Sequence, residues 1–94
     1  MYKIEMTRSF KRGLKSVAKR HKDIDKLQSV VDKLSAGKKL EAKYMDHQLT
    51  GSLKDYRDCH IEPDWVLVYR IYKDKLILFL TDTGTHQEVF KNRY

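Results

Sequence analysis

Hydrophobic positions recur along this chain in two different rhythms. Residues 2–6 alternate between apolar and polar, which predicts a short first strand. Within 10–18 and again within 24–34, apolar residues return every three or four positions and leave the opposite side polar. That spacing places them on one face of an amphipathic helix. The first third of the chain therefore predicts one strand followed by two helices.

Residues that begin and end helices flank both helical segments. Thr7 or Ser9 can cap the first helix, and Asp23 can cap the second, because their side-chain oxygens accept from the free N–H groups of a first turn. Gly37 follows the second helix and is suited to end it. The connection around His21 is short, so we expect the two helices to form an antiparallel hairpin.

The second half of the chain favours strands. Residues 38–52 have no regular period and predict an irregular connection. Lys73-Asp74 predicts a two-residue hairpin turn, and Thr83-Gly84-Thr85 predicts a break before a short helical turn over 86–90. The expected strands form a three-strand antiparallel meander over 53–61, 65–72 and 75–81.

These elements together predict an α+β fold. The helices are expected to cover one face of a single sheet and to leave the other face open for function. A length of 94 residues suits one domain over 1–94, with one modest core. Hydrophobic residues make up 40% of the chain, which is enough for a folded protein rather than a disordered one.

Charge and cysteine content narrow the partners and the compartment. The formal net charge is +7, which indicates an acidic partner such as a nucleic acid or an acidic protein. The longest apolar run is far too short to span a bilayer, so no membrane partner is expected. Cys59 is the only cysteine, so no intramolecular disulfide can form; this fits the reducing cytoplasm.

Candidate chemistry gathers just before the most apolar strand. Pro63 fixes its own φ and disfavours helix at the preceding residue, so 60–65 predicts a tight connection. That connection presents His60, Asp64 and Trp65 close together. An imidazole, a carboxylate and an indole are thus expected at the mouth of the central strand.

Several short motifs spread over the chain resemble one known family. The chain is similar to the YafQ-type toxins of the RelE/ParE superfamily, the toxin halves of bacterial type II toxin–antitoxin pairs. The resemblance covers nearly the whole chain. The motifs that carry it are Arg20-His21-Lys22-Asp23, Asp46-His47-x-Leu49-x-Gly51, Tyr56-Arg57-Asp58-x-His60-x-Glu62-Pro63-Asp64-Trp65 and Thr83-Gly84-Thr85-His86.

The resemblance implies a ribosome-dependent mRNA endonuclease that stops translation. It also implies a cognate antitoxin that holds the toxin inactive and contacts operator DNA, so that the toxin reaches DNA only through that complex. One position departs from the family pattern: Asp82 stands where YafQ-type toxins have a site arginine. The site residues that the resemblance implies are His47, His60, Asp64, Trp65, His86 and Phe90.

RNA cleavage by acid–base chemistry gives these residue types distinct roles. A base must take the proton of the 2′-hydroxyl and an acid must protonate the departing 5′-oxygen, and histidine suits both roles near neutral pH. His86, His60 and His47 are therefore the catalytic candidates, and the resemblance ranks His86 first, then His60, then His47. Asp64 is the fourth: it can orient a histidine, or it can simply cap the turn after Pro63.

RNA binding calls for cations and exposed rings. Arg57 and Lys54 are candidate phosphate contacts on the strand next to the central one. Trp65 and Phe90 can stack on an unpaired base. Both aromatic residues have an alternative reading as core residues.

A metal cofactor is not predicted. Three histidines and an aspartate are chemically adequate zinc ligands, but their spacing matches no compact zinc motif. A paired set of carboxylates for two magnesium ions is also lacking.

Two other functions stay open at the level of sequence. One is a non-enzymatic binding module with the same fold, such as a gyrase poison. The other is a toxin with weakened catalysis that serves mainly as a corepressor with its antitoxin, which Asp82 favours slightly. The three histidines separate these alternatives from a nuclease, because a binding module has no need of them.

Overall fold

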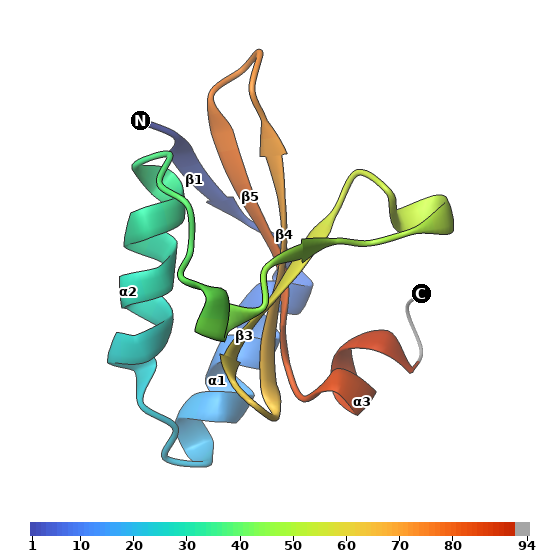
Figure 1. The fold of residues 1–94 in the computed structure, drawn as a ribbon. Coiled ribbons are helices and arrows are strands. Elements are labelled where there is room, and N and C mark those ends of the chain that lie inside the picture. Colours follow the sequence, from blue (N-terminus) through green and yellow to red (C-terminus); the bar gives the residue numbers. More distant parts are fainter. Residues whose placement is uncertain (92–94) are drawn as a thin grey trace.

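The computed structural model describes residues 1–91 and arranges five strands in one mixed sheet (Figure 1). The strands lie in the order β1-β5-β4-β3-β2. The strands are β1 (Lys3–Met6), β2 (His47–Gln48), β3 (Arg57–Glu62), β4 (Trp65–Tyr72) and β5 (Ile77–Gly84). The helices are α1 (Arg8–Lys19), α2 (Ile24–Ser35) and α3 (His86–Phe90), with short 3₁₀ turns η1 (Ala42–Tyr44) and η2 (Gly51–Leu53). The predicted α+β class is confirmed.

Local capping explains where the two long helices begin. The Thr7 hydroxyl accepts a hydrogen bond from the Phe10 N–H at 2.9 Å, so Thr7 rather than Ser9 is the cap of α1. The Asp23 carboxylate accepts from the Asp25 N–H at 3.1 Å at the start of α2. Gly37 follows α2 with a φ of 77°, a left-handed conformation that costs glycine little. The caps predicted at Thr7 and Asp23 and the end at Gly37 are confirmed.

The two long helices lie on one side of the sheet, each over its own strand. Helix α1 packs mainly against β5 and α2 against β3. Gly13 permits the close approach of α1, because a Cβ atom there would lie 2.1 Å from the Thr83 carbonyl oxygen. Strand β1 pairs in parallel with β5, which puts the first strand at the edge of the sheet.

The main core fills the space between these helices and the sheet. Helix residues such as Phe10, Val30 and Leu34 meet the inward side chains of β3, β4 and β5. The inward strand residues are Cys59, Ile61, Trp65, Leu67, Tyr69, Leu78 and Leu80. Because side chains alternate along a strand, their neighbours point to the opposite face.

The opposite face is partly covered by α3, whereas the sequence predicted it to be open. Val66 and Val68 of β4 pack against Val89 of α3 in a second, smaller apolar cluster. Among the described residues, no helix is long and apolar enough to cross a bilayer. The uncovered part of this face lies beside α3 and carries the polar groups described below.

Strand β3 differs from the prediction at its start. It begins at Arg57 rather than Leu53, because residues 51–53 form a 3₁₀ turn and the Tyr56 N–H donates to the Leu53 carbonyl at 2.9 Å. The irregular connection also contains a short strand that was not predicted, β2, which pairs with the start of β3.

Strand β5 begins and ends later than predicted. The turn before it spans residues 73–76 instead of two residues, and Leu76 adopts a φ of 54° there. The strand then runs past the expected break to Gly84. A bulge at Thr81, between the pairs Val68–Asp82 and Tyr69–Leu80, absorbs one extra residue and keeps the pairing with β4.

Candidate active site

A buried carboxylate, Asp58, lies at the centre of the polar face. Its side chain is 1% exposed, and one oxygen, Oδ2, lies 3.8 Å from His47 Nε2 and 3.7 Å from His86 Nε2. His47 reaches it because β2 pairs with β3 in a register that sets His47 opposite Asp58. His86 reaches it from the start of α3. Residues from three distant parts of the chain thus meet at one carboxylate.

His60 completes the cluster. It lies two residues after Asp58 on β3, so both side chains point to the same face. Its ring centroid is 5.0 Å from that of His86, with the rings tilted by 52°. His47 and His86 have about half of their side chains exposed, at 51% and 50%. The structure therefore brings together all three predicted histidines, and two of them remain open to a substrate.

Helix α3 fixes His86 through its first turn. The Thr85 hydroxyl accepts from the Glu88 N–H at 3.1 Å, and the Glu88 carboxylate accepts from the Thr85 N–H at 3.0 Å. This reciprocal capping box satisfies free donors at the start of a very short helix. Phe90 lies one turn later, and its ring centroid is 5.4 Å from that of His86. His86 and Phe90, two of the candidate site residues, are thus adjacent in space.

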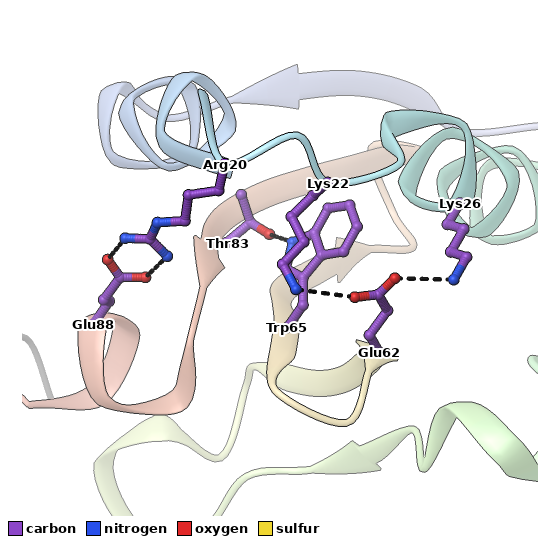
Figure 2. Close-up of polar contacts among 7 residues, drawn as sticks. All are labelled: Arg20, Lys22, Lys26, Glu62, Trp65, Thr83 and Glu88. Atoms are coloured by element: carbon purple, nitrogen blue, oxygen red, sulfur yellow. Dashed lines mark hydrogen bonds and ion pairs between the residues drawn. The ribbon is translucent and has the colours of Figure 1, made fainter. Parts of the chain in front are cut away.

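Residues from the end of α1 to the first turn of α2 form ion pairs on both sides of the site. Arg20 donates from both terminal nitrogens to the two oxygens of Glu88 on α3 (Figure 2). Lys22 Nζ lies 3.2 Å from one oxygen of Glu62 at the end of β3, and Lys26 Nζ lies 2.9 Å from the other. One short segment thus holds α3, which carries His86, and the end of the strand that carries His60.

Burial and the surrounding histidines act in opposite directions on the pKa of Asp58. Burial raises the pKa of Asp58, and the nearby histidines, His86 first, act in the opposite direction. Its other oxygen, Oδ1, has no hydrogen-bond partner among the described residues. An ionised carboxylate in this position is stabilised by a protonated imidazole beside it. Asp58 can therefore orient the rings of His47 and His86.

The predicted carboxylate, Asp64, is placed elsewhere. It is exposed in the turn between β3 and β4, and its charge acts on Arg20. Asp58 holds the place among the histidines that the sequence analysis expected for Asp64. The signal that was overlooked is the strand alternation, which puts Asp58 and His60 on one face.

Trp65 belongs to the core. It is 1% exposed, and its Nε1 donates to the Thr83 hydroxyl at 2.9 Å (Figure 2). Thr83 in turn donates to the Val66 carbonyl at 2.8 Å. The indole therefore offers no free face for stacking, and its alternative reading as a core residue is the one that the structure supports.

The two predicted phosphate contacts do not face the histidines. Arg57 lies on the helix side of β3, where its Nε is 3.3 Å from Asp46. Tyr69 donates to the same Asp46 oxygen at 2.6 Å. Lys54 follows η2, outside the strand where it was predicted. Alternation separates Arg57 from Asp58 and His60, although all three are on one strand.

Another cation, Arg70, lies on the histidine face. It follows Val66 and Val68 at every second position of β4, and Val68 pairs with Asp58. Its guanidinium lies over the rings of Tyr72, at 4.4 Å, and Tyr56, at 5.6 Å. The same alternation that identifies Asp58 would have identified Arg70 from the sequence.

Asp82, where the sequence was expected to depart from the family pattern, is also on this face. It pairs with Val68 from β5, on the other side of β4 from Asp58, and it is 4% exposed. Asp82 is therefore part of the wall of the site and not of a distant surface.

Three residues of the site could hold a metal ion. Asp58, His60 and His86 each offer one ligand atom, and these atoms all lie within 4.8 Å of one another. One carboxylate oxygen and two imidazole nitrogens are a set that zinc or copper accepts. Such an ion would use the same nitrogens that proton transfer requires.

Comparisons with known proteins agree with this architecture. A family model described as the bacterial toxin of type II toxin–antitoxin system, YafQ, matches residues 2–91. The mRNA interferase toxin YafQ of Escherichia coli strain K12 is 44% identical over 88 residues, which cover 93% of this chain and 94% of that protein.

Solved structures show the same fold. In the E. coli DinJ-YafQ complex, the matching chain superposes with a TM-score of 0.86 at 40% identity, covering 96% of this chain and 99% of that one. A metal-bound toxin from Helicobacter pylori superposes with a TM-score of 0.90 at 43% identity, covering 96% and 100%. The chain therefore belongs to the YafQ family of bacterial toxins of type II toxin–antitoxin systems.

Proposed function

We propose that this toxin is a ribosome-dependent mRNA interferase that cuts RNA by acid–base chemistry without a metal. The observation that carries the proposal is the gathering of His47, His60 and His86 around the buried carboxylate of Asp58. A module that only binds a partner has no need for this arrangement. The mRNA interferase name of its E. coli relative agrees with it.

The reaction needs two proton transfers. One histidine takes the proton from a 2′-hydroxyl, whose oxygen attacks the neighbouring phosphorus. A second histidine gives a proton to the departing 5′-oxygen. The P–O5′ bond breaks, which leaves a 2′,3′-cyclic phosphate and a 5′-hydroxyl. His86 and His60, with ring centroids 5.0 Å apart, form the pair, and which of them acts as the base stays open.

Neighbouring residues would orient the catalytic groups and the RNA. Asp58 Oδ2, which lies 3.8 Å from His47 Nε2 and 3.7 Å from His86 Nε2, would orient both rings. Phe90, beside His86, offers a ring on which a base can stack. Arg70 is the cation of this face best placed for a phosphate, in place of Arg57 and Lys54.

The partners follow from the family and from charge. We infer a cognate antitoxin with an acidic segment, because DinJ forms a complex with E. coli YafQ and this chain carries +7. The polar side of α1, with Arg12, Lys15 and Lys19, is one candidate surface for that segment. Operator DNA would be reached only through the antitoxin complex. The ribosome and mRNA place the activity in the cytoplasm.

Replacing His86 tests the proposal. His86→Gln keeps a hydrogen-bonding side chain but cannot transfer a proton, so cleavage of ribosome-bound mRNA should fall roughly a hundredfold or more. Thermal stability should change little, because half of the side chain is exposed. The control is His21→Asn: His21 has a φ of 61°, which asparagine tolerates, and it lies outside the cluster. Cleavage by His86→Gln at the wild-type rate would remove His86 from the mechanism.

A further inference from the structure

A groove extends from the histidine cluster along the open edge of β3. Strand β2 pairs only with Arg57 and Asp58, so the end of β3 has no strand beside it at this edge. The turn η1 approaches that edge instead. Between them lies a groove of about 560 Å³, with Tyr44 and Met45 on one side and Ile61 and Pro63 on the other. This volume is in the range of about 300–1,000 Å³ that holds small ligands.

The groove combines apolar walls with charged residues, namely Lys43, Lys26 and Glu62, of which Lys26 and Glu62 form an ion pair with each other. Met45 is 62% exposed and has a left-handed φ of 49°, which is unusual for a large apolar residue. Lys43 is part of the lining, and its Nζ lies 5.1 Å from the centre of the Tyr44 ring. An apolar surface beside a cation suits a nucleotide, whose base has a flat apolar face and whose phosphate is an anion.

One residue connects the groove to the proposed catalytic site. His60 lines the groove and also lies against His86 in the histidine cluster. An RNA strand with its scissile phosphate between these histidines would therefore have a neighbouring nucleotide at the mouth of the groove.

We propose that this groove binds an unpaired nucleotide of the RNA substrate next to the cleaved bond, with its base against Met45 and its phosphate near Lys43. The proposal rests on the RNA-cleaving function proposed above. It assigns two side chains to substrate binding: Lys43 of η1, and Met45, which directly follows η1 and whose carbonyl lies 2.8 Å from His47 Nδ1. Because the groove would contact a base, it would contribute to the choice of cleavage site.

Methionine signals provide a test that does not depend on activity. The chain has three methionines, so ¹³C-methyl labelling gives three signals, and Met6 is an exposed control on β1 at the other edge of the sheet. The probe is an RNA trinucleotide with 2′-O-methyl groups, which cannot be cut. We expect it to shift the Met45 methyl signal and the His60 ring signals while leaving Met6 unchanged.

Matched variants test the effect on cleavage. Met45→Ala should raise KM for ribosome-bound mRNA about tenfold and change the distribution of cut positions, while kcat changes less than about twofold, because base contacts are lost but the histidines are not. Met6→Ala should behave as wild type. Lys43→Gln should weaken binding most at low salt.

The outcomes separate this proposal from the function on which it rests. A trinucleotide that shifts only the histidine signals, or no signal at all, overturns the groove assignment. So does a Met45 signal that responds to a glutamate-rich peptide and not to the RNA, which would assign the groove to a protein partner. Wild-type protein that fails to cut mRNA on ribosomes would instead disprove the proposed activity, whatever the Met45 signal shows.

Discussion

The two faces of the sheet are built for different purposes. The face under α1 and α2 is almost entirely apolar, and Trp65, Leu67 and Leu78 on it are nearly inaccessible. The opposite face has a small cluster of three buried valines, together with two buried carboxylates, Asp58 and Asp82. Figure 1 shows the long helices away from α3, which borders the second face. Folding stability comes mainly from the first face, and the proposed chemistry belongs to the second.

The difference shows how a small domain can carry a buried charge. Burial of a carboxylate is unfavourable unless it is paired. Along β3, alternation sends Cys59 and Ile61 into the main core and Asp58 and His60 to the site. The packing of Cys59 and Ile61 in the core thus offsets the cost of burying Asp58 on the other face of the same strand. Substitutions on the two faces should therefore separate stability from activity.

The largest effect is expected for Trp65 on the apolar face. Trp65→Ala should lower the free energy of unfolding by about 3–5 kcal/mol, because it leaves a cavity and removes the hydrogen bond to Thr83. Urea denaturation measures this. Trp65→Phe, which keeps most of the packing, should remain folded and still cut mRNA. Loss of cleavage in a folded Trp65→Phe protein would instead indicate that the indole contacts RNA.

Asp58, on the polar face, should be needed for cleavage and not for stability. Asp58→Asn should lower cleavage roughly tenfold or more, because the histidines lose the charge that holds them. Thermal stability at pH 7 should rise. Burial raises the pKa of Asp58 above the usual 3.8, so its ionised form destabilises the folded state increasingly as pH rises through the folded-state pKa.

The stability gain of Asp58→Asn should accordingly shrink as pH falls toward 3.8. Asp64→Asn is the matched control, because Asp64 is exposed in the turn after Pro63. Asp64→Asn should leave both cleavage and thermal stability close to wild type. A greater loss of cleavage in Asp64→Asn than in Asp58→Asn would exchange the roles assigned to these two carboxylates.

A smaller effect is expected at the ion pair between Arg20, at the end of α1, and Glu88 of α3. Arg20→Gln should lower kcat a few-fold with little change in thermal stability, because it frees α3 and His86 at an exposed ion pair. Lys19→Gln is the control, because Lys19 is an exposed neighbour of Arg20 at the end of α1, and kcat should stay at the wild-type value.

The pH dependence of the cleavage rate gives a second test of the Arg20–Glu88 ion pair. Arg20 holds the pKa of Glu88 at about 2. The stabilisation from this pair is therefore present above the usual carboxyl value of 4.5 and is lost only as pH falls toward 2. The ratio of wild-type to Arg20→Gln rates should then be the same at pH 6 and pH 8.

The smallest effect is expected from metal removal. EDTA should leave cleavage unchanged once the magnesium that ribosomes need is restored. Copper or zinc should inhibit reversibly, by occupying Asp58, His60 and His86. Activity that is lost with EDTA and restored by zinc would show that a metal takes part in the reaction.

Local signals in the sequence were sufficient for much of the fold. Capping at Thr7 and Asp23, and the end at Gly37, depend on hydrogen bonds and backbone angles within a few residues. The two helices and the long central strand follow from periodicity. Boundaries were less predictable: the η2 turn and the Thr81 bulge are set by contacts with neighbouring strands, which shifted the start of β3 and the end of β5.

The residues of the site were likewise predictable only in part. Histidine residues identified by chemistry and motif do meet, but the carboxylate among them is Asp58 and not Asp64. Trp65 points into the main core. Arg57 lies on the helix side of β3, whereas Arg70 of β4 lies on the face that carries the histidines.

The sequence by itself determined the helices, the central strand and the residue types available for RNA chemistry. Only the tertiary structure decided the parallel pairing of β1 with β5, the register that sets His47 opposite Asp58, and the approach of His86 to that same carboxylate. The physical reason is range. Capping and periodicity act within one or two turns of chain, whereas strand order and register depend on the packing of residues far apart in sequence.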